Sequence, residues 1–182
     1  MKMPKKIYTI GHSTRSLEDF LELLRTYGIE VLADIRNFPG SRRYPHFNTD
    51  NLQEVLKKEG IEYVHLKALG GRRRPLPDSE NTGWRVEAFR GYADYMNTEE
   101  FKKALGELEN IASKKITAYM CSEAVWWSCH RALVSDQLKN KGWTVLHIMS
   151  LKKADEHPFT KPARIVDGQV TYPGEDLFSG KK

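Results

Sequence analysis

The sequence lacks the features of membrane-spanning, secreted and disulfide-rich proteins. No apolar run approaches the ~20 residues that a transmembrane helix needs. The start, MKMPKKIYTIGHS, has neither an apolar core nor a small-residue cleavage site of a secretory signal. Only 2 cysteines are present, too few for a secreted disulfide scaffold. We therefore expect a cytoplasmic protein with no membrane partner.

The body of the chain, without its two ends, also has almost no net charge. The 29 lysines and arginines exceed the 24 acidic residues, which gives +5. Lysines near the termini account for this whole excess: Lys2, Lys5, Lys6, Lys181 and Lys182. Terminal lysines are usually solvated, so the overall charge does not by itself indicate a nucleic-acid-binding protein.

Length and hydrophobic content fit one globular domain. The chain has 182 residues, of which 40% are hydrophobic, and a chain of this size buries about 70% of its extended surface. We predict a single domain over residues 1–182, with a core at 7–150 and a C-terminal extension at 151–182. There is no internal repeat or low-complexity linker.

Apolar β-rich runs alternate with helical patterns along the predicted core. The runs lie at 7–10, 29–35, 61–66, 115–121 and 143–148. Helices are expected to begin near Ser16, Asn48, Trp84, Thr98 and Ser128. This order predicts an α/β fold with a single open, mostly parallel sheet flanked by helices. The alternative is an α+β fold in which a C-terminal hairpin, turning at Asp167-Gly168, pairs with a sheet edge.

Polar and titratable residues recur where the predicted strands end. His12 and Ser13 follow the first strand, Asp34 and Arg36 close the second, and Cys121 closes the fourth, two residues before Glu123. Ligands bind outside the carboxyl ends of the strands in open parallel sheets. We therefore expect these side chains to meet around one cleft.

Two loops at the same predicted edge are rich in arginine. The loop after the second strand holds Arg36, Arg42 and Arg43, and the loop after the third holds Arg72, Arg73 and Arg74. Such loops attract a phosphate, a carboxylate or a nucleic acid. The plainer interpretation is that the arginines are solvated or pair with acidic helices.

The sharpest local motif runs from Cys121 to Arg131. Its last three residues, Cys129, His130 and Arg131, lie at a predicted helix start that favours a thiolate. Cys129 is then a nucleophilic or redox cysteine. Alternatively, it forms a reversible disulfide with Cys121, or the two cysteines and His130 hold a metal with another histidine. The spacing matches no zinc signature. The plainest interpretation is two buried structural cysteines.

Other candidates also have two interpretations. Glu123 is a general acid or base, or simply a carboxylate at a helix start. Asp34 and Arg36 share one face of a strand, either lining a cleft or forming a structural ion pair. His12 stands in a tight turn beside a ligand, or in a plain connector. Trp126 and Trp127 form a stacking platform for a base, or pack with one ring inside.

Taken together, the motifs resemble the domain-of-unknown-function family 488, in order from about residue 7 to 150. They are YTIGHS at 8–13, DIR at 34–36, YVHL at 63–66, LGG at 69–71, YADYM at 92–96, CSE at 121–123 and CHR at 129–131. The resemblance implies a compact α/β domain common in prokaryotes. It implies no settled activity.

Two functions from different classes follow. The first is an enzyme acting on a small anionic or nucleotide-like substrate. Its catalytic candidates are His12, Cys121, Glu123, Cys129 and His130, and its substrate-binding candidates are Ser13, Asp34, Arg36 and Arg131. The second is a nucleic-acid or nucleotide-binding module without catalysis. No P-loop, dinucleotide fingerprint or serine-hydrolase elbow is present, so the sequence names no reaction, cofactor or oligomeric state, and we assign no metal.

Overall fold

Six strands form the central sheet of the computed structural model, which describes residues 3–174. They are β1 (Lys6–Gly11), β2 (Val31–Asp34), β3 (Glu62–His65), β4 (Thr117–Cys121), β5 (Thr144–Ser150) and β6 (Lys153–Glu156). Their order is β3-β2-β4-β1-β5-β6, and only β6 runs antiparallel to its neighbour. The predicted α/β fold with a mostly parallel sheet is confirmed. The terminal Lys2, Lys181 and Lys182 lie outside the described residues.

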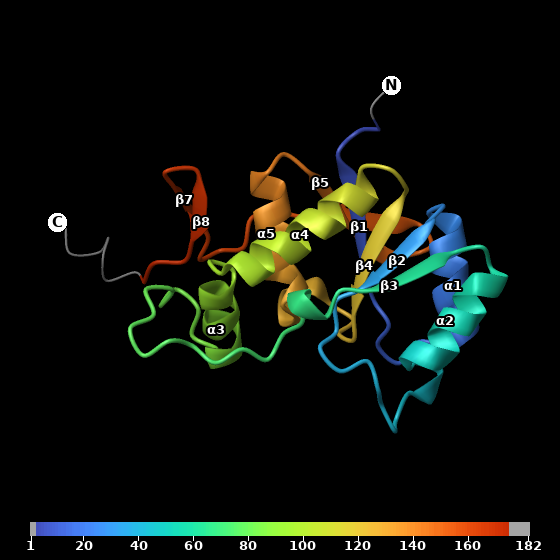
Figure 1. The fold of residues 1–182 in the computed structure, drawn as a ribbon. Coiled ribbons are helices and arrows are strands. Elements are labelled where there is room, and N and C mark those ends of the chain that lie inside the picture. Colours follow the sequence, from blue (N-terminus) through green and yellow to red (C-terminus); the bar gives the residue numbers. More distant parts are fainter. Residues whose placement is uncertain (1–2, 175–182) are drawn as a thin grey trace.

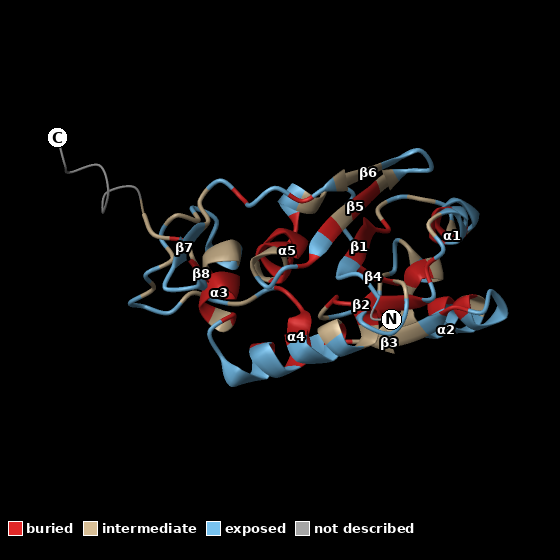
Figure 2. Cartoon of the chain, turned by 90° about the horizontal axis from the view of Figure 1, so that it is seen from above, coloured by how far each residue is buried: buried red, intermediate tan, exposed pale blue. Residues whose placement is uncertain are grey.

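Helices cover both faces of this sheet (Figure 1). The helices α1 (Leu17–Thr26) and α2 (Thr49–Lys58) pack on one face, and α4 (Glu99–Ala112) and α5 (Arg131–Asn140) on the other, with α3 (Glu87–Tyr95) beside α5. Short 3₁₀ turns lie at η1 (Pro45–Phe47), η2 (Lys67–Leu69) and η3 (Trp126–Ser128). In α1, α2 and α4 the buried residues turn toward the sheet and the exposed residues away from it, whereas α5 has no exposed residue (Figure 2). No helix within residues 3–174 is long and apolar enough to cross a membrane.

Local signals in the sequence explain where several helices begin and end. The Ser16 Oγ accepts the Asp19 N–H at 3.1 Å, and the Thr98 Oγ1 accepts the Phe101 N–H at 3.2 Å. Gly28 follows α1 with φ +66°, a conformation that favours glycine. Two predicted boundaries are wrong: α3 begins at Glu87 rather than Trp84, and α5 at Arg131 after the separate turn η3.

The C-terminal hairpin exists but does not pair with the sheet. Strands β7 (Arg164–Val166) and β8 (Gln169–Thr171) form their own two-stranded sheet, turning at Asp167 and Gly168 with φ 51° and 77°. The α+β alternative is therefore wrong. The edge beside β5 is taken by β6, a strand that the sequence pattern did not predict.

The chain connections create a crevice at the carboxyl ends of β1 and β4. These two strands are neighbours, with Gly11 opposite Cys121. From β1 the chain crosses through α1 to β2, on the far side of β4. From β4 it crosses through α5 to β5, on the far side of β1. Because the two connections leave in opposite directions, the crevice between them is the position where open α/β sheets bind ligands.

Candidate functional site

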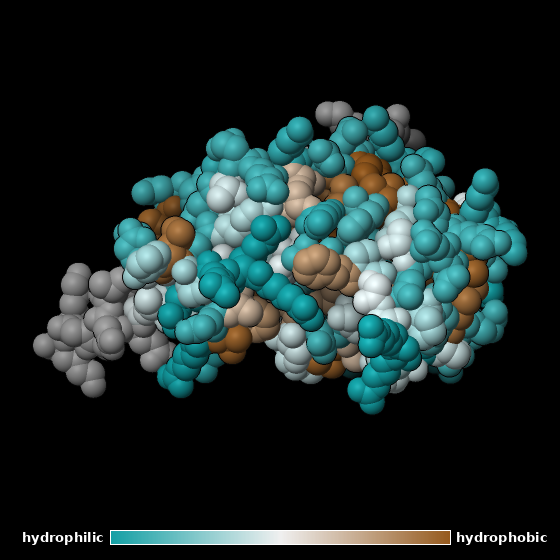
Figure 3. Space-filling model, turned by 60° about the horizontal axis from the view of Figure 1, so that its bottom comes forward, coloured by the Kyte–Doolittle hydropathy of each residue, from teal (hydrophilic) through white to brown (hydrophobic). Residues whose placement is uncertain are grey.

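A cleft of about 800 Å³ opens at this crevice. Segments that follow β1, β2, β3 and β4 all contribute to its walls. Hydrophilic side chains cover most of this face of the molecule (Figure 3). The structure brings together seven of the nine predicted site residues as cleft lining: His12, Ser13, Arg36, Cys121, Glu123, Cys129 and His130.

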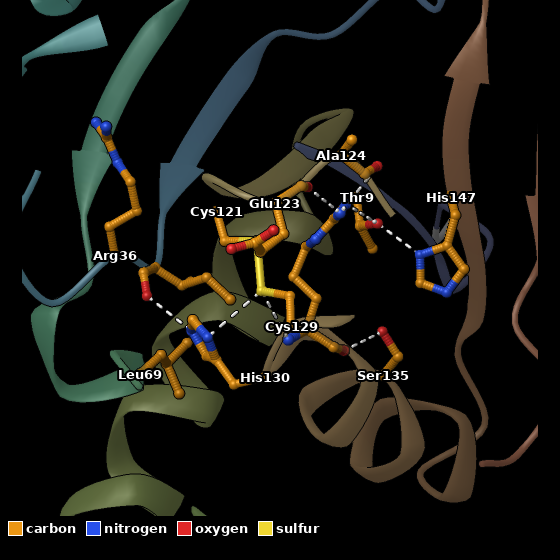
Figure 4. The surroundings of a disulfide bond; sticks show 12 residues. Thr9, Arg36, Leu69, Cys121, Glu123, Ala124, Cys129, His130, Ser135 and His147 are labelled. Carbon is orange, nitrogen blue, oxygen red and sulfur yellow. Dashed lines mark hydrogen bonds between the residues drawn. A yellow bond between two sulfur atoms is a disulfide. The ribbon is translucent and has the colours of Figure 1, made fainter. Parts of the chain in front are cut away.

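Asp34 and Arg131, the other two, lie behind the cleft wall. Asp34 is fully buried, and its Oδ2 lies 2.7 Å from Nη2 of Arg36. The Tyr63 hydroxyl donates to the same carboxylate at 2.6 Å, and Arg36 also donates to the Phe47 carbonyl at 2.7 Å. The Arg36 side chain points away from the cysteines (Figure 4). Asp34 and Arg36 thus form a buried ion pair whose arginine touches the cleft.

Cys121 and Cys129 are joined as a disulfide between the end of β4 and the start of α5 (Figure 4). Both residues are buried. The Cys129 sulfur accepts the backbone N–H of Arg131 at 3.5 Å and lies 3.5 Å from Nδ1 of His130. Within residues 3–174 no three His, Cys, Asp or Glu side chains gather as a metal-ligand set.

His130 is held in one orientation at the helix start. Its Nε2 lies 3.0 Å from the Ile35 carbonyl oxygen, and its ring packs on Tyr92 with centroids 5.1 Å apart. A Cβ on Gly71 would come within 3.0 Å of Nδ1, so a larger residue there would press on the ring. Burial lowers the pKa of His130 to about 4, so the ring is neutral at pH 7.

His12 is neutral as well. Its Nδ1 donates to the Ser13 carbonyl at 2.9 Å, and its ring stacks on Phe47 with centroids 4.4 Å apart. Burial is the main cause that lowers its pKa to about 4. With both histidines neutral at pH 7, positive charge in the cleft comes from arginine side chains.

Arg43 and Arg72 are the cleft-lining arginines that can meet an anion. Both are exposed, and neither has a carboxylate within 4.0 Å among residues 3–174. Arg72 and the cleft residue Ser13 have φ values of 62° and 48°. Such left-handed conformations at non-glycine residues cluster at ligand sites. Glu123 is the acidic residue of the lining.

Arg131 supports the cleft wall from inside. Its Nη2 donates to the Glu123 carbonyl at 2.7 Å, and its Nη1 donates to the Thr9 hydroxyl at 3.1 Å. Any Cβ on Gly11 would collide with the Glu123 carbonyl oxygen, so this close approach of two segments requires glycine. Arg131 thus positions the main chain of the wall and does not itself line the cleft.

Sequence reasoning missed the buried polar chain that continues inward from Arg131. Thr9 Oγ1 lies 2.6 Å from His147 Nδ1, His147 Nε2 lies 2.9 Å from His157 Nδ1, and His157 Nε2 lies 2.8 Å from Asp136 Oδ1. Asp136 also accepts from the Tyr172 hydroxyl at 2.9 Å. Two signals were available: His147 is a titratable residue in the fifth predicted strand, and Asp136 is a carboxylate among apolar neighbours in α5. Burial usually requires a carboxylate to be paired.

The tryptophan pair does not make a two-ring platform. Trp126 stacks on His147 with centroids 4.7 Å apart and an interplanar angle of 7°. Trp127 is 55% exposed and stands nearly perpendicular to Trp126 at 88°. One ring is packed inside and the other is exposed, and neither lines the cleft.

Comparison with known proteins finds a match at the level of the family. No curated protein and no solved structure matches the chain. The profile of the family described as "Domain of unknown function DUF488" matches residues 16–138. This span includes the predicted DIR, CSE and CHR motifs and both cysteines. The chain therefore belongs to the DUF488 family.

Proposed function

We propose that the protein is an enzyme that uses the Cys129 sulfur on a small anionic substrate bound in the cleft. The observation that carries this proposal is the position of Cys129. Its sulfur lies at a cleft wall, at the start of a ten-residue helix, beside a histidine nitrogen. The helix start and the neighbouring histidine nitrogen both favour thiol reactivity, and the cleft gives a substrate access to the sulfur.

The hydrogen bonds of His130 fix which of its nitrogens faces the sulfur. The Ile35 carbonyl can only accept, so Nε2 carries the ring proton. Nδ1 therefore presents a lone pair toward the Cys129 sulfur and can accept the thiol hydrogen. The N–H of Arg131 and the helix dipole stabilise the negative charge that then develops on sulfur.

The working form in this proposal is the dithiol. Two molecules of a thiol reductant reduce the disulfide: each thiol gives up one hydrogen, Cys121 and Cys129 become thiols, and the reductant becomes its own disulfide. The reducing cytoplasm that the sequence predicts keeps such thiols free. Cys121 then serves as the partner that protects Cys129 when oxidant is present.

The cleft fits a substrate of nucleotide size. Its volume of about 800 Å³ lies within the range of small-molecule sites. Arg43 and Arg72 supply positive charge, and Ser13 and Glu123 supply a hydroxyl and a carboxylate at the same walls. Asp34 and Arg131 hold the walls in place from behind, and Arg36 lines the cleft while paired with Asp34. Glu123 is the group that we assign to proton transfer with the substrate.

Alkylation of the reduced protein tests the sulfur chemistry. Iodoacetamide should react with Cys129 with a pH midpoint below ~8.5, the value of an ordinary thiol. Cys129→Ser should abolish the fast reaction, whereas Cys121→Ser should retain it. A midpoint at or above the ordinary value, or equal slow labelling of both cysteines, would overturn the assignment.

Binding of AMP, measured by calorimetry, tests the substrate class. Arg72→Gln should weaken binding by about tenfold, the loss expected for one charge-assisted contact. Arg74→Gln is the matched control, because Arg74 is equally exposed but does not line the cleft. Tight binding of single-stranded nucleic acid with a steep salt dependence, unchanged in Cys129→Ser, would favour a binding module instead.

A further inference from the structure

Arg131 is a buried cation without a carboxylate partner in the part of the chain that the structure describes. The residue is 1% exposed, and its donors reach a hydroxyl and main-chain carbonyls rather than an acid. Burial lowers its pKa to about 10, so it stays charged at pH 7. Burying such a charge is costly unless it is well paired. This desolvation cost indicates that the main-chain segment bound by Arg131, at Glu123 and Ala124, has a role.

The contacts of Arg131 set the direction of two peptide groups. Its Nη2 donates to the carbonyls of Glu123 at 2.7 Å and Ala124 at 3.5 Å. In a planar trans peptide the C=O and the following N–H point in opposite directions. The N–H groups of Ala124 and Val125 therefore both point away from Arg131. Ala124 and Val125 line the cleft, and Arg131 lies behind its wall, so the direction away from Arg131 is the direction of the cleft.

Two successive N–H groups that point the same way form a concave site for an anion. Among residues 3–174 neither N–H has a hydrogen-bond acceptor. Arg72 and Arg43 line the same cleft and add positive charge. The carboxylate of Glu123 is the opposing charge in the lining, so the site favours a ligand that offers both an anion and a hydroxyl.

The buried polar chain keeps Arg131 in place. With both histidines neutral, Asp136 accepts the Nε2–H of His157, and Nδ1 of His157 accepts the Nε2–H of His147. In these tautomers His147 Nδ1 accepts from the Thr9 hydroxyl, and the Thr9 oxygen accepts from Arg131. This chain of hydrogen bonds thus connects Asp136 in the interior to Arg131 behind the wall of the cleft.

We propose that the main-chain N–H groups of Ala124 and Val125 bind a tetrahedral oxyanion, the phosphate group of the substrate. This inference rests on the proposed function for its location, and it names the charged group by which the substrate is held. Arg131 is a positioning residue in this site. Phosphate binding does not require a free thiolate, so the site is testable without any chemistry at Cys129.

A ¹⁵N-HSQC titration of the oxidised wild-type protein with inorganic phosphate tests the site directly. The amide signals of Ala124 and Val125 should move downfield with saturation and more than any other signals. AMP should move the same two signals if the site holds a phosphate that is part of a larger substrate. If phosphate and AMP leave both signals in place, the proposal is wrong.

Proline substitution removes one of the two donors. Ala124→Pro lacks the N–H and should weaken phosphate binding by about tenfold, the effect of one hydrogen bond to a charged group. Ala124→Gly is the matched control, because it retains the N–H and should bind within about twofold of wild type. Equal affinities of the two variants would contradict the site. If Ala124→Pro does not fold, the HSQC titration of the wild type decides.

These results are separable from those for the proposed enzyme. If Cys129 has an ordinary thiol pKa but the two amide signals shift, the oxyanion site stands and the sulfur chemistry fails. If Cys129 is reactive but the signals do not shift, the reverse holds.

Discussion

Two buried arginines at the cleft, Arg36 and Arg131, have their positive charges stabilised in different ways. Arg36 is 7% exposed and forms a bidentate pair with Asp34, through Nε to Oδ1 and Nη2 to Oδ2, and Asp34 also accepts from Tyr63. Arg131 is 1% exposed, and among residues 3–174 its guanidinium donates to a hydroxyl and to main-chain carbonyl oxygens, with no carboxylate acceptor. Arg131 is linked to the Asp136 carboxylate through a chain of hydrogen bonds that passes through the Thr9 hydroxyl and two histidines.

The comparison distinguishes two roles for a buried cation. Arg36 stabilises the packing around Asp34, and Arg131 orients the main chain at the cleft wall. The charge of Arg36 is neutralised where it stands, so it contributes little field to the cleft. The charge of Arg131 is not neutralised at contact distance, and its donors instead orient the main chain at Glu123 and Ala124. An ion pair such as Asp34–Arg36 fixes the positions of two side chains. A cation that binds carbonyl oxygens, such as Arg131, fixes the direction of the peptide groups and hence of their N–H groups.

Acidification should affect the Arg131 side most strongly. On the Arg131 side, burial lowers the pKa of His130 to about 4 and that of His147 to about 2, below the ordinary 6.5. On the Arg36 side, it lowers the pKa of one histidine, His12, to about 4. Below pH 6.5 the unfolded chain binds protons that the folded protein does not. The stability present above pH 6.5 is therefore lost as the pH falls, by up to ~1.4 kcal/mol per pH unit for each histidine. Urea unfolding between pH 7 and 5 measures this slope.

Hydrogen exchange at pH 5 localises that loss. The amides of β5 and α5, which surround His147 and Arg131, should lose protection before those of β2, which carries Asp34. Uniform loss along the chain, or a stability that does not change between pH 7 and 5, would contradict the contrast between the two arginines.

Asp34→Asn should destabilise the protein by about 3–5 kcal/mol, because it leaves the Arg36 charge buried without its carboxylate. Urea unfolding measures the change. The double variant Asp34→Leu with Arg36→Met serves as control and should recover most of the loss, since no unpaired charge remains. If the single and double variants are equally unstable, packing rather than charge balance is the dominant contribution of this pair.

Thr9→Val should have the smallest effect, about 1–2 kcal/mol, because it removes one hydroxyl that links Arg131 to His147. Thr9→Ser retains the hydroxyl and is the matched control. The amide signals of Ala124 and Val125 should also move in Thr9→Val, because Arg131 loses one anchor. Identical stabilities and spectra for the two variants would show that the hydroxyl does not hold Arg131.

Signals confined to a few neighbouring residues could be predicted from the sequence. Ser16 and Thr98 cap their helices, and Asp167-Gly168 turns the hairpin, because each depends only on local hydrogen bonds or backbone angles. The strand ends could be placed because buried parallel strands read as apolar runs. Once the strands are parallel, the residues that follow them must share one edge, so His12, Cys121 and Glu123 meet there.

Other features could not be read from local pattern. His157 reaches Asp136 because β6 folds back along β5, a pairing with no strong signal in the residues 153–156. Arg131 was predicted to bind substrate because it stands beside Cys129 and His130. Its direction into the interior depends on Gly11 leaving room for the Glu123 carbonyl, which is a contact over more than a hundred residues.

The sequence alone determined the alternation of strands and helices and the edge of the sheet to which the titratable residues come, because both follow from periodicity and from the shared direction of parallel strands. Only the tertiary structure decided which charges are neutralised and which organise the main chain. A charge acts over a few ångströms in space, and the partners that fall within that distance come from segments that the order of residues does not bring together.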